Sequence, residues 1–145
     1  MRTAPAIALL LLVAPAAGPV QAEPRVGSFR VVVNPGNPLT AVERQFVLDA
    51  FLKRATRWEN GDALHPVDLI ADSPVRRRFS QDVLGRPVSA IQSYWQQAIF
   101  SGRDVPPPEL DTDEAVIQYV LKYRGAVGYV SETADTHAVK IVTVK

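Results

Sequence analysis

The sequence contains no cysteine, and among its 145 residues it has two histidines and one methionine. Without cysteine, the chain has neither a disulfide framework nor a thiolate metal site. The histidines, His65 and His137, lack the spacing of a metal-binding motif. We therefore expect no metal and no cofactor, and a fold that is held together by its hydrophobic core.

The chain also lacks an excess of charge of either sign, with 16 Lys and Arg against 15 Asp and Glu. Proteins that bind nucleic acids usually present a strongly basic face, so the even balance argues against a nucleic-acid partner. A nucleophile signature such as Gly-x-Ser-x-Gly is missing as well. We therefore predict no catalytic residues and do not expect an enzyme.

A long hydrophobic run is also missing, and the longest apolar stretch is the N-terminal run 6–13. It follows Arg2 and is followed by small residues up to Ala22, an order that is typical of a secretory signal peptide. The run is shorter than the roughly 20 residues that cross a bilayer, although a retained anchor is the alternative. We predict a signal peptide at 1–22, an exported protein with no membrane span after cleavage, and a single domain at 23–145.

Apolar periodicity divides the remaining chain into alternating strands and helices. Strands are expected at 29–33, 67–70, 126–130 and 139–144. Helices are expected from residue 41 to 51, from 74 to about 84, from 88 to 100 and from 112 to 121. The alternation predicts an α/β fold, a three-layer sandwich around a mostly parallel sheet of about four to five strands.

Capping residues mark three of the expected helix starts. Thr40 with Glu43, and Asp111 with Glu114, have the spacing of a capping box. Ser73 stands before a proline, which is the usual order of an N-cap and the first helical residue. Gly102 is expected to end the third helix in a left-handed conformation.

Ligands of open α/β sheets bind beyond the carboxyl ends of the strands, next to helix starts. In a mostly parallel sheet, the segments that follow three of the strands would meet there. The free amides at the Ser73 helix start favour an anion, and the Arg76 guanidinium matches oxyanion oxygens in pairs. The ligand-binding residues that we predict for a small anion are Asn34, Asn37, Ser73, Arg76 and Ser131.

Arg76 is the first of three consecutive arginines. Successive helical residues point in different directions, so at most one or two of the three can face one ligand. We expect Val75, Phe79 and Val83 to form the buried face of this helix. The alternative for the arginines is that they are solvated or paired with nearby acids.

Three segments carry a resemblance to a known family, in order along the chain: 34–38 (Asn-Pro-Gly-Asn-Pro), 56–58 (Thr-Arg-Trp) and 124–130 (Arg-Gly-Ala-Val-Gly-Tyr-Val). Together they resemble one lobe of the phosphate-binding branch of the type 2 periplasmic binding proteins. The resemblance covers nearly all of 23–145. It implies a periplasmic, solute-binding module of an ABC-type uptake system, with a membrane permease as a partner. It also implies that Trp58 fills the corner between a helix and a strand.

The sequence departs from the family at the turn before the second helix. The family carries an arginine there, followed by Ser-Gly-Thr and a second arginine. This chain keeps Ser73 and Arg76 but has Leu69, Pro74 and Val75 at the positions of the first arginine, the glycine and the threonine. Each change removes a charge or a hydrogen-bond donor from the anion site.

Two functions therefore remain open. The chain binds phosphate or another small oxyanion, with a protein partner supplying the second wall that a single lobe lacks. Alternatively, it is a degenerate binding-protein scaffold that acts as a periplasmic protein-interaction or sensory module without a transport function.

Overall fold

The computed structural model describes residues 14, 17–19 and 25–145. Most of the expected signal peptide, 1–22, lies outside the described residues, so export and the boundary at residue 23 stay predictions. The helices and strands, in chain order, are β1 (Phe29–Val33), β2 (Ala41–Val42), α1 (Arg44–Phe51), β3 (His65–Pro66), β4 (Asp68–Leu69), α2 (Pro74–Phe79), the π-helical turn η1 (Ser80–Leu84), α3 (Val88–Phe100), β5 (Glu109–Leu110), α4 (Asp113–Lys122), β6 (Ala126–Ser131) and β7 (Lys140–Val144).

Over the described residues, the main sheet has five strands in the order β2-β7-β1-β6-β3. The α/β fold and the strand number agree with the sequence analysis, but the sheet is mixed rather than mostly parallel. β1 runs antiparallel to both of its neighbours, β6 and β7, whereas the outer pairs β2–β7 and β3–β6 are parallel. A strand that is covered by helices on both faces is apolar whether it runs parallel or antiparallel to its neighbours. The apolar pattern therefore did not reveal the direction of β1.

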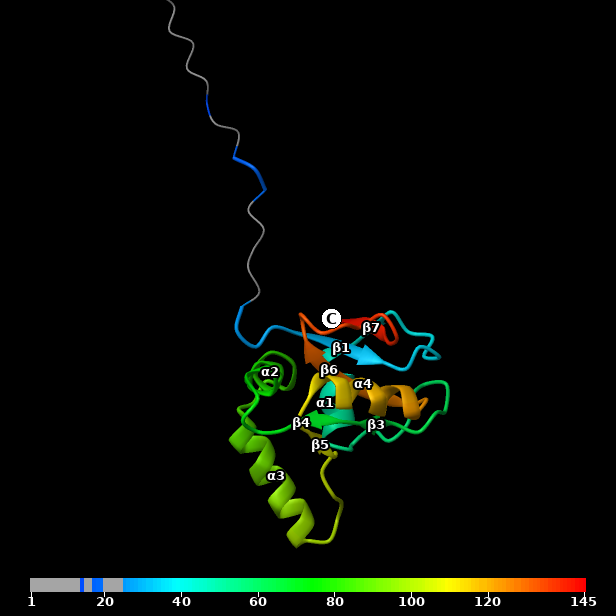
Figure 1. Ribbon diagram of the computed structural model, residues 1–145. Coiled ribbons are helices and arrows are strands. Elements are labelled where there is room, and N and C mark those ends of the chain that lie inside the picture. The colour runs from blue at the N-terminus through cyan, green and yellow to red at the C-terminus, as the bar shows by residue number, and fades with distance from the viewer. Residues whose placement is uncertain (1–13, 15–16, 20–24) are drawn as a thin grey trace, which may run out of the picture.

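Helices cover both faces of this sheet, which confirms the three layers (Figure 1). On one face, the Tyr129 ring stacks on Phe79, which ends α2, with ring centroids 3.8 Å apart. On the other face, a Cβ at Gly128 would lie 2.9 Å from the side chain of Val116 in α4. Side chains alternate between the faces of a strand, so neighbouring residues of β6 contact opposite helical layers. Val32 in β1 is fully buried between these layers.

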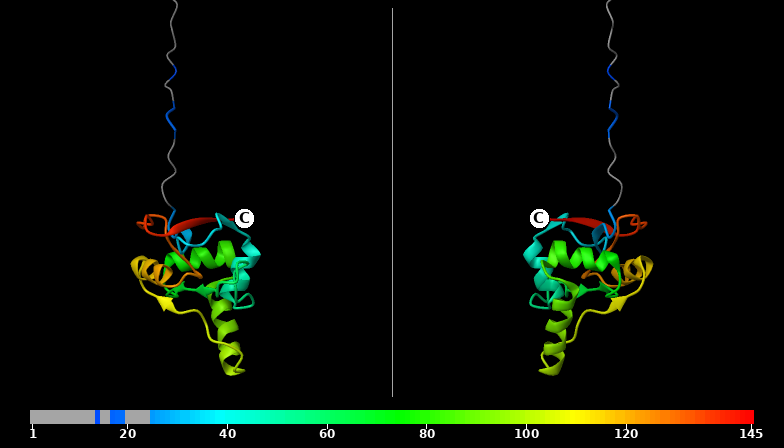
Figure 2. Two further views of the ribbon diagram at one scale, coloured as in Figure 1. Left: turned by 90° about the vertical axis from the view of Figure 1, so that its right-hand side faces the viewer. Right: turned by 90° about the vertical axis from the view of Figure 1, so that its left-hand side faces the viewer.

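The helix α3 projects away from the sheet (Figures 1 and 2). It is 13 residues long and buries only a narrow stripe, Ile91, Trp95 and Ala98. Beyond it, a proline-rich connector leads to β5, which pairs in parallel with β4 to form a separate two-stranded sheet. Ile99 and Phe100, at the tip of α3, are 53% and 95% exposed. In the described part of the chain, no helix is long and apolar enough to cross a membrane.

The expected caps hold in part. Ser73 caps α2, and Gly102 has the expected left-handed conformation with φ of 68°. The capping box at Thr40 is wrong, because β2 follows it and α1 begins later, after Glu43. The cap at Asp111 is wrong by one residue, since the Thr112 hydroxyl accepts the bond from the Ala115 amide.

Candidate functional site

The residues that we expected to bind a ligand lie at two opposite ends of the sheet. β1 and β6 are antiparallel, with Phe29 opposite Ser131 and Val33 opposite Val127. Asn34 follows β1 and lies five residues from Phe29, so it is separated from Ser131 by about 17 Å along the strand at the usual rise per residue. The expectation that the segment after β1, 34–37, meets Ser131 at one edge of the sheet is wrong, because β1 runs antiparallel to β6.

At the first end, Asn34 and Asn37 hold the chain in place. The Asn34 side-chain amide donates to the carbonyl of Val120 at 3.0 Å, and its oxygen accepts the Gly36 amide at 2.9 Å. Asn37 is 5% exposed, and its side-chain oxygen accepts the Leu39 amide at 2.9 Å. Both side chains stabilise the turns after β1, and a role in ligand binding stays a prediction.

At the other end, Ser73 and Ser131 are also engaged within the protein. The Ser73 hydroxyl accepts the Arg76 amide at 3.3 Å, and the Arg77 amide donates to the Ser73 carbonyl. Pro74 has no amide hydrogen to donate. Ser131 bonds through both its amide and its hydroxyl to the Asp113 carboxylate. The helix start thus has few free donors, and Ser131 faces a carboxylate that repels anions.

Arg76 has the most unusual environment of the expected residues. Its guanidinium is buried, and Nη1 donates to the Leu69 carbonyl at 2.8 Å and to Glu109 Oε2 at 2.6 Å. Nε lies 3.7 Å from Asp68 Oδ1. A buried arginine must be paired to offset the loss of its hydration, and here two carboxylates from the β4–β5 sheet and a backbone carbonyl do so.

Asp68 and Tyr129 complete this buried network. The Tyr129 hydroxyl donates to Asp68 Oδ1 at 2.5 Å and accepts the Leu69 amide at 3.2 Å. Burial raises the pKa of Asp68 from its ordinary 3.8 to about 6, against the opposing effects of the Arg76 charge and the Tyr129 hydrogen bond. Burial, followed by the Asp68 charge, raises the pKa of Tyr129. Asp68 can therefore change its charge in mildly acidic solution.

We expect Asp68 to make the free energy of unfolding depend on pH. Its pKa is raised in the folded state, so the ionised form is disfavoured there, and stability falls as pH rises from about 4 to about 6. A shift of this size corresponds to a loss on the order of 3 kcal/mol. Urea unfolding at several pH values should show this slope in the wild type and not in Asp68→Asn.

Asp111→Asn is the matched control, because Asp111 is exposed. This control should keep the slope of the wild type. Equal slopes in the wild type and in Asp68→Asn would contradict the raised pKa.

Arg76 and its partners reach a cavity between α3 and the proline-rich connector. Its volume is about 220 Å³, and the residues that line it are Asp68, Arg76, Gln92, Trp95, Gln96, Ile99, Pro106, Pro107 and Glu109. The Trp95 indole nitrogen is buried and has no hydrogen-bond partner within the part of the chain that the structure describes. The cavity, hereafter the Arg76 cavity, thus combines a buried cation, two acids and amide side chains.

Sequence reasoning singled out Arg76 but missed Asp68, Glu109 and Tyr129. A signal for Asp68 was present, because a charged residue inside the apolar run 67–70 is rarely buried without a partner. Glu109 carried no such signal, since it follows three prolines in what looks like an extended connector.

The two histidines lie elsewhere in the fold. The His65 ring stacks on Tyr123, with centroids 4.7 Å apart. His137 is exposed and pairs with Asp135, whose pKa this contact lowers. Among the described residues, no cluster of three or more His, Asp or Glu could hold a metal ion.

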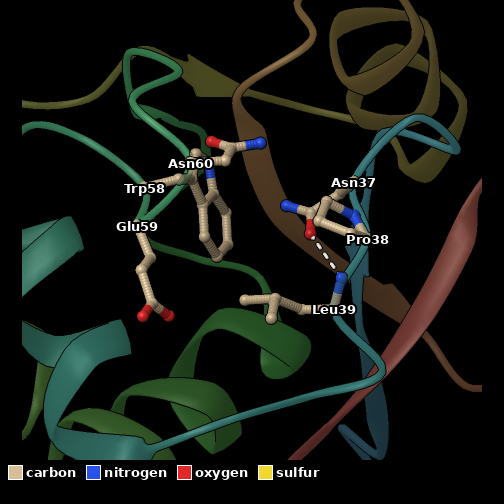
Figure 3. A pocket seen from close by; sticks show the side chains of 6 residues that line it. All are labelled: Asn37, Pro38, Leu39, Trp58, Glu59 and Asn60. Atoms are coloured by element: carbon tan, nitrogen blue, oxygen red, sulfur yellow. Dashed lines mark hydrogen bonds between the residues drawn. The ribbon is translucent and has the colours of Figure 1, made fainter.

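A second, apolar concavity lies beside Trp58. Trp58 is 5% exposed, and its indole nitrogen donates to the Gly125 carbonyl at 2.9 Å, so the side chain joins the loop after α1 to the start of β6. Figure 3 shows the Trp58 ring and the Leu39 side chain facing one another across this pocket, with Asn37 and Glu59 nearby. Phe46 of α1 packs against Trp58 with ring centroids 5.2 Å apart.

Comparison with known proteins gives matches among solved structures. No family model and no curated protein matches the sequence. An ABC-type phosphate transport receptor from Vibrio cholerae superposes with a TM-score of 0.61 and 18% identity, over 84% of this chain and 49% of that one. A putative phosphate ABC transporter substrate-binding protein from Clostridium perfringens, with bound phosphate, has a TM-score of 0.62 and 17% identity, over 84% and 48%. A possible phosphate binding protein from Planctomyces limnophilus has a TM-score of 0.59 and 14% identity, over 81% and 41%.

This chain thus spans about half the length of each of these proteins. At such low identity the likeness concerns the backbone arrangement alone. It agrees with the resemblance of 34–38, 56–58 and 124–130 to one lobe of a type 2 periplasmic binding protein. The chain has the fold of one lobe of the phosphate-receptor structures.

Proposed function

We propose that the chain is an exported, periplasmic, solute-binding-like module that takes a small oxyanion, such as phosphate, in the Arg76 cavity. The observation that carries this proposal is a buried guanidinium on the wall of an open cavity, on a scaffold shared with phosphate receptors. Arginine is suited to oxyanions because its planar donors match two oxygens at once. The role is non-enzymatic, and an ABC-type permease is the partner that would receive the anion.

Two features of the cavity allow an anion to enter. The Glu109 side chain is 41% exposed, so it can turn toward water when an anion takes its place on Arg76. Asp68 has a pKa of about 6, so it can accept a proton and lose the charge that would repel the anion. Gln92 and Gln96 offer amide donors on the same wall. Binding in this site is therefore favoured by a proton on Asp68.

We expect sulfate to bind more tightly in mildly acidic solution, because sulfate keeps its charge there while Asp68 loses its own. Calorimetric titration of the mature chain at about pH 5.5 and about pH 8 should show roughly a tenfold difference in Kd, for a repulsion of about 1.4 kcal/mol. Glu109→Gln removes the competing carboxylate and should tighten binding at the higher pH.

Glu132→Gln is the control for this substitution, because Glu132 is exposed and its side chain does not line the Arg76 cavity. It should leave the Kd unchanged. An absence of heat with millimolar sulfate, phosphate and acetate, in the wild type and in Glu109→Gln at both pH values, would rule out the anion site.

A protein-interaction or sensory module without a transport function is the second candidate. Specific observations favour it: the Ser73 helix start has few free donors, and both acids already neutralise Arg76. Affinity for a free anion is low when it must displace such a partner. Such a module would use a surface other than the Arg76 cavity.

A further inference from the structure

The sheet has an open edge at β2. β2 is the first strand in the sheet order and, among the described residues, pairs only with β7. The carbonyls of Thr40 and Val42 accept the amides of Thr143 and Lys145, at 3.0 and 2.9 Å. In a parallel ladder, alternate residues bond to the same neighbour, so the amide and carbonyl of Ala41 point away from β7. Ala41 therefore presents one donor and one acceptor at the edge.

An apolar groove lies along this edge. It consists of two adjoining cavities of about 220 and 260 Å³ that share Leu39, Trp58 and Glu59. The second cavity is also lined by Ala41 and three neighbours of the strand and helix, namely Val42, Glu43 and Phe46. We call this surface, 37–43 with Phe46 and 58–60, the Trp58 groove. Its first cavity is the pocket in Figure 3.

The side chains that line the Trp58 groove favour some kinds of ligand over others. Leu39, Phe46 and Trp58 provide an apolar wall, and two exposed carboxylates, Glu43 and Glu59, stand beside it. Among the described residues that line the groove, none is basic. The two acids disfavour anionic ligands such as nucleic acids, and they favour a partner with a cation next to an apolar side chain.

We propose that the Trp58 groove receives an extended segment of a protein partner, which pairs with the backbone of Ala41, places an apolar side chain against Trp58 and sets a lysine or arginine against Glu43 or Glu59. Addition of a strand to an open sheet edge supplies affinity through main-chain bonds and specificity through pockets for alternate side chains. The groove has both parts: the Ala41 amide and carbonyl, which have no partner in the part of the chain that the structure describes, and an adjacent pocket. This inference rests on the second candidate function and is independent of anion binding.

The test uses end-blocked peptides added to the mature chain. The probe is a peptide in which valine or leucine alternates with polar residues, namely threonine and lysine. The control peptide has glutamate in place of each lysine. NMR titration should shift the Ala41 amide and the Trp58 indole signals with the basic peptide. The acidic peptide should bind with a Kd at least about tenfold higher, which corresponds to a difference of about 1.4 kcal/mol in binding free energy.

Two variants locate the binding. Ala41→Pro removes the outward amide and leaves the bonds to β7, which a proline at a sheet edge permits. Glu59→Lys reverses one charge, and Glu132→Lys is its matched exposed control. We expect the first two to weaken peptide binding at least about tenfold and the control to leave it unchanged. All three should leave the sulfate titration of the Arg76 cavity as it is in the wild type.

Three results would overturn the proposal. They are an absence of shifts at millimolar basic peptide, shifts that map outside the Trp58 groove, and binding that neither Ala41→Pro nor Glu59→Lys reduces. Concentration-dependent dimerisation that Ala41→Pro abolishes would instead identify a second copy of this chain as the occupant. A failed sulfate titration with intact peptide binding would reject the anion site alone.

Discussion

Gly125→Ala should destabilise the protein by about 3 to 5 kcal/mol, among the largest effects of a single substitution in this fold. A Cβ at this position would lie 1.7 Å from the carbonyl oxygen of Ala63 and 2.8 Å from its carbon. Both atoms belong to the backbone, so a rotamer change cannot relieve the overlap. The chain before β3 or the start of β6 must move instead.

That movement would break further contacts. The Gly125 carbonyl accepts the His65 amide at 3.0 Å and the Trp58 indole at 2.9 Å. These bonds attach β3 and the loop after α1 to the centre of the sheet. Domains have a total stability of roughly 5 to 15 kcal/mol, so the expected loss is at least about a fifth of the total, and the midpoint of urea unfolding should fall clearly.

Urea unfolding followed by circular dichroism measures this loss. Gly85→Ala is the matched control, because a Cβ there has no heavy atom within 4 Å. Its φ of 67° costs a non-glycine residue about 1 to 2 kcal/mol, so the control includes backbone strain but not steric overlap. Gly125 is not among the described glycines with a positive φ, so a stability equal to that of the wild type in Gly125→Ala would show that the close approach relaxes without cost.

Local elements of this fold follow from the sequence because local periodicity determines them. The apolar run at 29–33 and the helical stripe between residues 88 and 100 coincide with β1 and α3. Ser73 was recognised as a cap because its neighbour is a proline. In each case the signal lies within a few residues of the element that it predicts.

The direction of β1 could not be read in this way. The buried part of β1, Val31 to Val33, is apolar on both faces, and it would be so whether β1 ran parallel or antiparallel to β6. Its direction decides where Asn34 and Ser131 lie, so the candidate site could not be assembled from the motifs alone. The resemblance to one lobe of a binding protein led to the right fold.

The environment of Arg76 shows a different limit. Arg76 lies on the buried helical face, because it precedes the buried residues Phe79 by three positions, Ser80 by four and Val83 by seven. Val75, which we expected on this face, is only partly buried. An aliphatic residue is the usual choice for a buried helix face. Arg76 can stand there because two acids, one in β4 and one in β5, pair with it, and the apolar pattern of the helix contains no information about these acids.

Arg76→Met should cost about 3 to 5 kcal/mol at neutral pH, because it leaves Asp68 buried without its cation. Methionine fills a similar volume, so the loss reports mainly on charge. Without the guanidinium, burial raises the pKa of Asp68 further, and the carboxyl group takes up a proton instead. The cost should therefore be smaller at about pH 5 than at about pH 8.

The double variant Arg76→Met/Asp68→Asn separates the charge from the packing. It removes the buried acid together with its partner, and the asparagine oxygen can still accept the Tyr129 hydroxyl. A buried ion pair that is replaced on both sides is often close to neutral in stability, so most of the loss should be recovered. Urea unfolding of the four proteins at both pH values completes this double-mutant cycle. If the double variant is as unstable as Arg76→Met, the Arg76 bonds to Leu69 and Glu109 stabilise the fold more than the pairing with Asp68 does.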